Sequence, residues 1–266
     1  MPMFSRPKGI TQRRPRNPPP QTRCGREQLA TADSSALEPA RAKEAMNSCF
    51  TNMLLGAVLL AGCQHRPPGP PKESGAFRES ALIEITSLDP TIHLDIRYAT
   101  TNNFMHRSMY AQAKAFLQQP AASALARAHR SLRAKGYGIV VFDAYRPWSV
   151  TRIFWESASA AERKIEFVAN PKKGSRHNRG CAVDISLFEL SSGAEVKMPS
   201  AYDEFTERAF PTYARGTPES TALRDLLREA MEAEGFTVYK TEWWHFDFKD
   251  WPQYRILDIP FDRIGR

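Results

Sequence analysis

Cysteine is scarce in this 266-residue sequence, and the placement of the few cysteines excludes two kinds of scaffold. Three of the four, Cys24, Cys49 and Cys63, lie in the first quarter of the chain, which leaves Cys181 alone in the remainder. A lone cysteine cannot form an internal disulfide framework. Because no Cys-x-x-Cys pair occurs, a zinc site built from cysteines is excluded as well.

A strong positive charge is also missing from most of the chain. The formal net charge is +8, but residues 1–45 carry nine Lys/Arg against four Asp/Glu, and residues 46–63 carry no charge. From Gln64 onward the excess is only +3. That part of the chain contains no Lys/Arg-rich run of the kind that binds along a phosphate backbone. We therefore expect no nucleic-acid partner.

Long hydrophobic runs are absent. The longest apolar stretch, Met53–Ala61, is shorter than the roughly 20 residues that a helix needs to span a bilayer. It has the length of the hydrophobic region of a secretory signal peptide. Leu60-Ala61-Gly62-Cys63 follows it and resembles the lipobox of bacterial lipoproteins, whose cysteine is lipidated and begins the mature chain. The alternative is a buried apolar helix followed by a loop cysteine.

The flanking segments fit an exported, anchored protein. Residues 1–45 are rich in Pro, Arg, Gln, Ser and Thr without a hydrophobic period, which predicts a disordered extension; alternatively, Met46 is the true start. Residues 46–63 are the expected signal peptide, and the Pro-rich residues 64–79 are the expected tether. The resemblance implies a cell-envelope or periplasmic protein that is lipid-anchored to a membrane at Cys63.

Residues 80–266 have the composition of one domain of ordinary size. Alternating or continuous apolar residues predict strands at 83–85, 92–98, 137–142, 181–187, 236–239 and 244–248. Helical periodicity predicts helices at 120–135, 148–161 and 218–234. Because helices and strands do not alternate strictly, we expect an α+β fold: a small, mainly antiparallel sheet with helices packed on it.

Five of the six histidines lie in this domain, and two of them have unusual surroundings. His93, His106 and His129 occupy ordinary strand, loop and helix positions, so we interpret them as structural. His177 lies on a glycine-bounded loop, and His245 ends the segment Glu-Trp-Trp-His.

Each of these two histidines has a carboxylate close by in the sequence. Asp184 follows His177 by seven residues inside an apolar strand, where a carboxylate is costly to bury unless it is paired or metal-bound. Glu242 stands three residues before His245. Two histidines and one carboxylate, with a fourth position open, are the composition of a catalytic zinc site. An aromatic core cluster with a salt-bridged Glu242 fits the same residues, and composition leaves both readings open.

The spacing of Glu242 and His245 makes a structural demand. In a regular strand these two side chains point to opposite faces, because the side-chain period is two. If both serve one site, the backbone between them must turn or bulge.

Three ordered motifs carry a resemblance to a known family. They are Asp143-Ala-Tyr-Arg146-Pro147, then Ser175-x-His177-x-x-Gly180-x-Ala182-x-Asp184, then Glu242-Trp-Trp-His245-Phe246. In this order they resemble the zinc D-alanyl-D-alanine dipeptidases of the vancomycin-resistance type. The segment from Leu94 to Phe104 also looks like that family's first strand and loop, so the resemblance covers roughly residues 80–261.

The resemblance implies one Zn²⁺ per chain and a role for each motif residue. His177, Asp184 and His245 are implied as zinc ligands, with Glu242 as the catalytic base. A zinc ion lowers the pKa of its water toward ~7 and polarises a carbonyl, while a neighbouring carboxylate can take the water's proton and return it to the leaving amine.

Further positions are implied as substrate contacts. Arg146 is implied to stabilise the oxyanion, although pairing with Asp143 to brace a turn is an equally good reading of its residue type. Asp203 is implied to receive the ammonium group of the dipeptide, and Ser175 to lie in the loop that meets its carboxylate. Arg176 departs from the family pattern and adds a cation near that carboxylate. Cys181 also departs from it, and we expect a small buried residue there.

The resemblance therefore implies hydrolysis of D-Ala-D-Ala, or of short D-amino-acid peptides, in the cell envelope. The alternative within enzymes is a zinc D,D-carboxypeptidase or endopeptidase acting on peptidoglycan stem peptides, and Trp243 favours the dipeptidase. A non-catalytic, metal-bound, peptide-binding lipoprotein is the alternative outside enzymes, but such a protein would have little reason to keep Glu242.

Overall fold

The computed structural model describes residues 68–265. The expectations for residues 1–45 and 46–63, including lipidation of Cys63, lie outside the described residues, as do the first four residues of the expected tether. Residues 68–81 contain no helix or strand. No helix within the described part of the chain is both long and apolar enough to cross a membrane.

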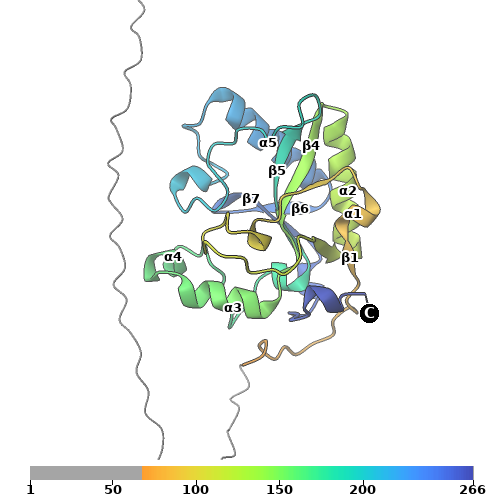
Figure 1. The fold of residues 1–266 in the computed structure, drawn as a ribbon, viewed down its shortest axis with the longest axis vertical. Coiled ribbons are helices and arrows are strands. Elements are labelled where there is room, and N and C mark those ends of the chain that lie inside the picture. Colours follow the sequence, from red (N-terminus) through yellow and green to blue (C-terminus); the bar gives the residue numbers. More distant parts are fainter. Residues whose placement is uncertain (1–67, 266) are drawn as a thin grey trace, which may run out of the picture. The chain divides into compact units, whose positions relative to one another are not determined.

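A five-stranded sheet forms the centre of the fold (Figure 1). Its strand order is β2-β4-β5-β7-β6, and the neighbours are antiparallel except for the parallel pair β2–β4. The strands are β2 (His93–Leu94), β4 (Tyr137–Asp143), β5 (Ala182–Glu189), β6 (Phe236–Tyr239) and β7 (Glu242–Phe248). A separate antiparallel ribbon joins β1 (Leu82–Glu84) to β3 (Phe116–Gln118). The α+β fold with a mainly antiparallel sheet is confirmed.

Two long helices pack against each other and against the sheet: α2 (Gln119–Arg133) contacts β4, and α5 (Pro218–Ala233) contacts β6 (Figure 1). Each carries a proline in its first turn, where the missing N–H is not needed. The shorter helices are α1 (Ile85–Leu88), α3 (Trp148–Ser157) and α4 (Ala160–Lys164). Single 3₁₀ turns are η1 (Arg97–Ala99), η2 (His177–Arg179), η3 (Glu207–Ala209), η4 (Trp251–Gln253) and η5 (Phe261–Arg263).

The two faces of the sheet separate the main core from a second, smaller cluster. Along β5, Val183, Ile185 and Leu187 belong to the main core with residues of α2 and α5. Phe188 lies on the opposite face and packs with Val140 and Phe142 of β4. Because alternate residues of a strand point to opposite faces, Asp184 shares the face of Phe188 rather than that of the main core.

His129 is a buried structural histidine that links α2 to the sheet. Its Nδ1 accepts the backbone N–H of Ile139 at 3.0 Å, which places the ring proton on Nε2, 3.0 Å from the hydroxyl of Thr91. Burial lowers the pKa of His129 to about 4, so the ring is neutral.

Two predicted elements are wrong in extent. The strand predicted at 92–98 is only His93–Leu94, because the chain turns into η1 after the Asp95 N–H bonds to the carbonyl of Val141. The helix predicted at 148–161 ends at Ser157, since Ala158 is extended. Ser159 then begins α4 with a capping box.

Candidate active site

The register of three central strands places three polar side chains in a row. Asp143 of β4 pairs with Asp184 of β5, and Asp184 pairs with His245 of β7. Directly paired residues project from the same face of a sheet. The first pairing depends on a bulge in β4 between Val141 and Asp143. Val141 pairs with Ile185 of the main core, and the next pair along the strands is Asp143 with Asp184, so one residue of β4 is left without a partner. Without that extra residue Asp143 would face away from Asp184.

His177 reaches the same place from the turn before β5. The turn η2 ends at Gly180, whose φ of 66° lies in the left-handed region that favours glycine. A Cβ at Gly180 would also meet the side chain of Leu82 at 2.5 Å. His177 is buried, and its Nδ1 lies 2.6 Å from the carbonyl oxygen of Ala144. Nδ1 therefore carries the proton and donates it, which leaves a lone pair on Nε2.

The ring of His245 is oriented by a carboxylate. Its Nε2 lies 2.9 Å from Oδ1 of Asp247 and donates to it, so the lone pair of Nδ1 points toward His177. Asp247 is a residue that the sequence analysis missed. Alternation along β7 could have found it, because residues 245 and 247 share one face of the strand.

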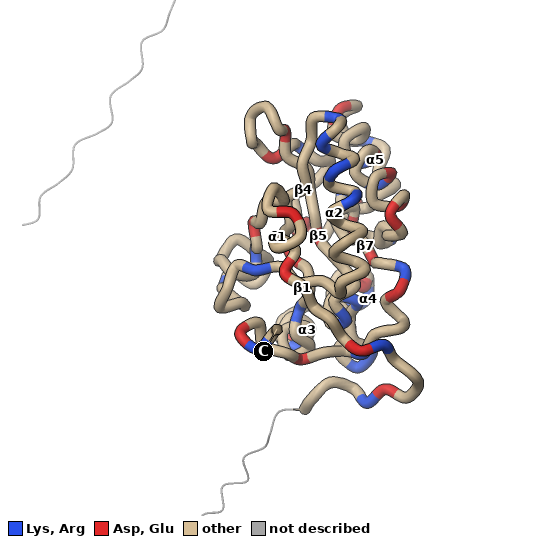
Figure 2. The backbone as a smooth tube through the Cα atoms, turned by 90° about the vertical axis from the view of Figure 1, so that its right-hand side faces the viewer, with Lys and Arg blue, Asp and Glu red and all other residues tan. Residues whose placement is uncertain are grey.

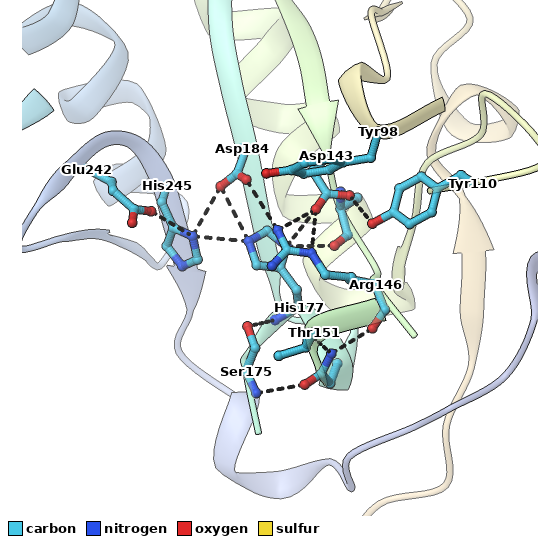
Figure 3. Close-up of polar contacts among 12 residues, drawn as sticks. Tyr98, Tyr110, Asp143, Arg146, Thr151, Ser175, His177, Asp184, Glu242 and His245 are labelled. Carbon is cyan, nitrogen blue, oxygen red and sulfur yellow. Dashed lines mark hydrogen bonds and ion pairs between the residues drawn. The ribbon is translucent and has the colours of Figure 1, made fainter. Parts of the chain in front are cut away.

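Three atoms with free electron pairs converge at this point (Figure 3). Nε2 of His177 and Nδ1 of His245 are 3.1 Å apart, and Oδ1 of Asp184 lies 3.4 and 3.1 Å from them. Ligands bound at 2.0–2.1 Å in a tetrahedron are about 3.3 Å from one another. Oδ1 of Asp184 is buried without a hydrogen-bond donor. The donor set and its spacing therefore fit a divalent metal ion.

Glu242 lies beside this cluster because β7 bulges. Tyr239 pairs with Glu242 while its neighbour Val238 pairs with Phe246, so residues 243–245 have no partners on β6. The turn or bulge demanded by the spacing of Glu242 and His245 is thus present, and Oε2 of Glu242 lies 3.7 Å from Nδ1 of His245. The pKa of Glu242 is raised to about 8, chiefly by burial; His245 opposes the shift, and the charges of Asp184 and Asp203 add to it.

Arg146 both braces a turn and faces the cluster (Figure 3). Its Nε and Nη2 donate to Oδ2 of Asp143 at 2.9 and 2.6 Å, which is the bracing pair that its residue type suggested. Its guanidinium lies 4.8 Å from the ring centre of Phe154 and 5.3 Å from that of Tyr98. Nη2 is also 3.9 Å from Oδ2 of Asp184. The cation is therefore held rigidly at the edge of the site.

Asp203 lies on the side of the site formed by tyrosines. Its backbone has a φ of 58°, and its carboxylate accepts the hydroxyl of Tyr98 at 3.2 and 3.1 Å. Burial and the charge of Asp184 raise the pKa of Asp203 to about 7, while the Tyr98 hydroxyl opposes the shift. Tyr202 donates its hydroxyl to Oδ2 of Asp184 at 3.0 Å. Both tyrosines were missed in the sequence, where nothing in their spacing marks them.

Ser175 supports the turn that carries His177. Its hydroxyl oxygen accepts the backbone N–H of His177 at 3.2 Å, and its own N–H donates to Oδ1 of Asn178 at 2.8 Å (Figure 3). Asn178 in turn donates to the carbonyl of Arg146. Cys181, next along the chain after Gly180, is fully buried as expected, and burial raises the pKa of its thiol to about 12.

All seven candidate site residues of the domain line one cavity of about 390 Å³. This size is within the range of small-molecule sites. Aromatic and basic side chains complete the wall, among them Trp251, Arg176, Arg179 and Tyr239. Basic and acidic residues are interspersed along the backbone in Figure 2. The seven lining residues are Arg146, Ser175, His177, Asp184, Asp203, Glu242 and His245.

Comparisons with known proteins show which family this chain resembles. A family model described as D-ala-D-ala dipeptidase matches residues 78–261. A D-alanyl-D-alanine dipeptidase of Enterococcus faecalis is 32% identical over 200 residues, covering 69% of this chain and 95% of its own length. A protein of the same name from Escherichia coli is 28% identical over 180 residues, covering 68% and 91%.

Two solved structures are remote likenesses. The LdcB LD-carboxypeptidase shares 19% identity at a TM-score of 0.40, over 67% of this chain and 74% of that one. VanYB in complex with D-alanine-D-alanine shares 17% at a TM-score of 0.33, over 52% and 78%. Since the family model covers well over half of the chain, this protein belongs to the D-Ala-D-Ala dipeptidase family of peptidases.

Proposed function

We propose that this protein hydrolyses D-alanyl-D-alanine to two molecules of D-alanine, with Zn²⁺ held by His177, Asp184 and His245. The observation that carries the proposal is the convergence of three potential ligand atoms, one each from His177, Asp184 and His245, with a buried carboxylate beside them. Curated relatives that this chain resembles are named for this reaction.

Zinc is the metal that the donor set favours. His177, Asp184 and His245 would hold the ion with two imidazoles and one carboxylate, a ligand set that catalytic rather than structural zinc sites use. When bound, Zn²⁺ acts as a Lewis acid that polarises the scissile carbonyl and makes water more acidic. The outer hydrogen bonds to Ala144 and Asp247 keep both imidazoles in the tautomer that a metal requires.

Glu242 moves the protons of the reaction. Its carboxylate accepts a proton from the attacking water and delivers it to the nitrogen of the leaving D-alanine as the C–N bond breaks. Burial already favours its protonated form, and a base whose pKa lies near the working pH can both take up and release a proton.

Arg146 stabilises the negative charge that develops on the carbonyl oxygen. Asp143 accepts hydrogen bonds from two nitrogens of Arg146, so the guanidinium does not have to reorganise during the reaction. Tyr110 and the Ala144 N–H bind the other oxygen of Asp143, both at 2.9 Å, and lock that carboxylate in turn.

The two charged ends of the dipeptide meet opposite charges in the cavity. Asp203, held by Tyr98, receives the α-ammonium group. Ser175 and Arg176 lie in the loop on which we place the carboxylate. Arg176 lies 4.7 Å from the ring centre of Trp251, and its Nε is 3.5 Å from Asp247.

The test is a comparison of substrates with metal analysis on the same sample. We expect turnover of D-Ala-D-Ala with about one zinc per chain, and little turnover of D-Ala-D-lactate or a stem pentapeptide. Preference for the pentapeptide would favour the carboxypeptidase or endopeptidase alternative. Metal binding without turnover of any of the three would favour the non-catalytic alternative.

The cellular location is part of the same proposal. We place the enzyme in the cell envelope, lipid-anchored at Cys63, because Leu60-Ala61-Gly62-Cys63 resembles a lipobox. The full-length protein should fractionate with membranes in a bacterial host, and Cys63→Ala should release it or block its processing. An unchanged distribution in that variant would contradict the anchor.

A further inference from the structure

The segment that enters the domain is attached to it before the family match begins. Residues 73–77 precede the matched region, and they contain no helix or strand. They nevertheless lie along the loop that follows β7, near the C-terminal end of the chain (Figure 1). Arg78 donates its N–H to the carbonyl of Gln253 at 2.8 Å and pairs with Asp250 at 3.0 Å. Phe77 stacks under the guanidinium of Arg255 at 4.3 Å.

Glu73 makes the strongest of these contacts, and both of its carboxylate oxygens are used. Oε1 accepts Nη2 of Arg179 at 2.6 Å, and Oε2 accepts the backbone N–H of Ile256 at 2.7 Å. Its backbone carbonyl accepts Nη1 of Arg255 at 3.0 Å. The Glu73 side chain is only 17% exposed. Charge-assisted hydrogen bonds that are shielded from water are the stronger kind.

The partner of Glu73 belongs to the turn that carries a metal-site histidine. Arg179 is the last residue of η2, two residues after His177, and it is buried. Its Nη1 donates to the carbonyl of Tyr254, and its guanidinium lies 5.5 Å from the ring centre of Trp251. Arg179 and Trp251 both line the cavity.

Contacts on two sides of η2 attach this turn to the loop that contains Ile256 and Leu257. On one side, the backbone of Asn178 accepts the N–H of Leu257 at 2.9 Å. On the other, Glu73 joins Arg179 to Ile256, the residue next to Leu257. Without Glu73, the buried Arg179 would lose its only carboxylate partner among residues 68–265, and the loop would lose one of its attachments.

We propose that Glu73 is a positioning residue of the active site, acting through Arg179 to hold the His177 turn and the Trp251 wall. The segment before the family match is thus part of the catalytic unit. The proposal rests on the proposed function for the identity of the metal.

The experiment uses the full-length chain with Glu73→Ala and Glu73→Gln, each loaded with zinc. Glu79→Ala is the matched control, because Glu79 is an exposed glutamate that closely follows this segment and has no hydrogen bond or ion pair to the described residues. The zinc dissociation constant is measured by chelator competition well below the melting temperature, and the absorption spectrum of the Co²⁺-loaded protein is recorded. KM and kcat for D-Ala-D-Ala are measured in parallel.

We expect Glu73→Ala to weaken zinc binding by about 10-fold, the lower end of what partners outside the ligand shell contribute. The Co²⁺ spectrum should shift, and the control should match the wild type. Glu73→Gln keeps one acceptor and should fall between the two. Arg179→Ala combined with Glu73→Ala should be no worse than Arg179→Ala alone, because the two residues act as a unit.

A lower melting temperature with unchanged zinc affinity, Co²⁺ spectrum and KM would overturn the proposal and leave Glu73 a purely stabilising residue. If Glu73→Ala does not fold, Glu73→Gln decides by the same measurements. Absence of dipeptide turnover in the wild type would contradict the proposed function, but it would leave the comparison of metal affinities intact.

Discussion

The imidazoles of the metal cluster show how much of the site depends on hydrogen bonds one layer outside it. Each ring donates a hydrogen bond to an acceptor outside the cluster: His177 to the carbonyl of Ala144, and His245 to the carboxylate of Asp247. The electron pairs that remain point at each other and at Asp184. A cation bound among these atoms would make the arrangement favourable, because Oδ1 of Asp184 is buried without a hydrogen-bond partner.

Asp247 should therefore control metal affinity without being a ligand. We expect Asp247→Asn to weaken zinc binding by about 10- to 100-fold, since an amide holds the imidazole less strongly than a carboxylate does. His245→Ala and His177→Ala should each remove the metal altogether, because each deletes one of the three proposed ligands. Metal analysis after dialysis measures both effects, and full occupancy in the two alanine variants would rule out the site.

Glu242 should separate binding from chemistry. Glu242→Ala should keep zinc and fold but lose turnover by at least about 10²-fold, because we propose that the residue transfers protons rather than holding the metal. Zinc content and kcat measured on one preparation check this. A loss of zinc in proportion to activity would instead make Glu242 a ligand.

Asp203 should set the length of the substrate. Capping the amine of the dipeptide would leave this carboxylate buried and unpaired, at a cost of roughly 1–3 kcal/mol. N-acetyl-D-Ala-D-Ala should thus be a much poorer substrate than D-Ala-D-Ala, and Asp203→Ala should narrow the gap. Equal kcat/KM for both substrates in the wild type would move the protein to the carboxypeptidase alternative.

At the scale of secondary-structure elements, two bulges build the site. The bulge in β4 turns Asp143 toward Asp184, and the bulge in β7 brings Glu242 to the side of His245. Regular strands would place one member of each pair on the other face of the sheet. Regular strand pairing is therefore interrupted at the points where the polar side chains converge.

The contact between α2 and β4 gives the fold a sensitivity to acid. The pKa of His129 is about 4 in the folded protein and 6.5 when the ring is unperturbed. As pH falls from 6.5 toward 4, the unfolded chain binds a proton at His129 that the folded chain does not, so the contribution of His129 to stability is complete above pH 6.5 and decreases below it. The loss should reach about 3 kcal/mol.

Urea unfolding of the metal-free protein between pH 4 and 7 measures this effect. His129→Asn keeps an acceptor for the N–H of Ile139 but does not titrate, so the stability of the wild type relative to this variant should fall as the pH falls from 6.5 to 4. His93→Asn, which changes an exposed histidine, should keep the wild-type slope. Parallel profiles for the wild type and His129→Asn would contradict the assignment.

At the scale of the whole molecule, the cavity concentrates acidic groups that need a counter-ion. Burial raises the pKa of Glu242 to about 8 and that of Asp203 to about 7. In the metal-free protein these groups hold protons that the unfolded chain releases from about pH 4 upward. The free energy of unfolding should therefore fall as pH rises toward 8.

Zinc should offset that loss. At a free concentration of 100 times the dissociation constant, a ligand of the folded state adds about 2.7 kcal/mol. Melting curves with and without a chelator should thus diverge, with the metal-free protein less stable at pH 8 than at pH 6. A metal-free protein that becomes more stable over this range would show that these carboxyl groups ionise normally.

The sequence by itself was sufficient for the fold class, for most elements and for the residue types of the site. Apolar periodicity located α2 and α5 to within two residues, and the motifs around His177 and His245 marked the cluster and its neighbours. These features are local, because the periodicity of a helix or the residues of a motif lie within one short segment of the sequence.

Only the tertiary structure decided how these residues meet. The bulges depend on pairing between strands that are distant in the sequence, and no local pattern reports a cross-strand register. The same holds for Asp247 and Tyr98, whose roles come from their hydrogen bonds to His245 and Asp203. Glu73 is the clearest case, since its Pro-rich surroundings are typical of a tether, yet its carboxylate finds Arg179 more than a hundred residues away. Charge pairing over such a distance is a property of the folded chain, and composition alone does not reveal it.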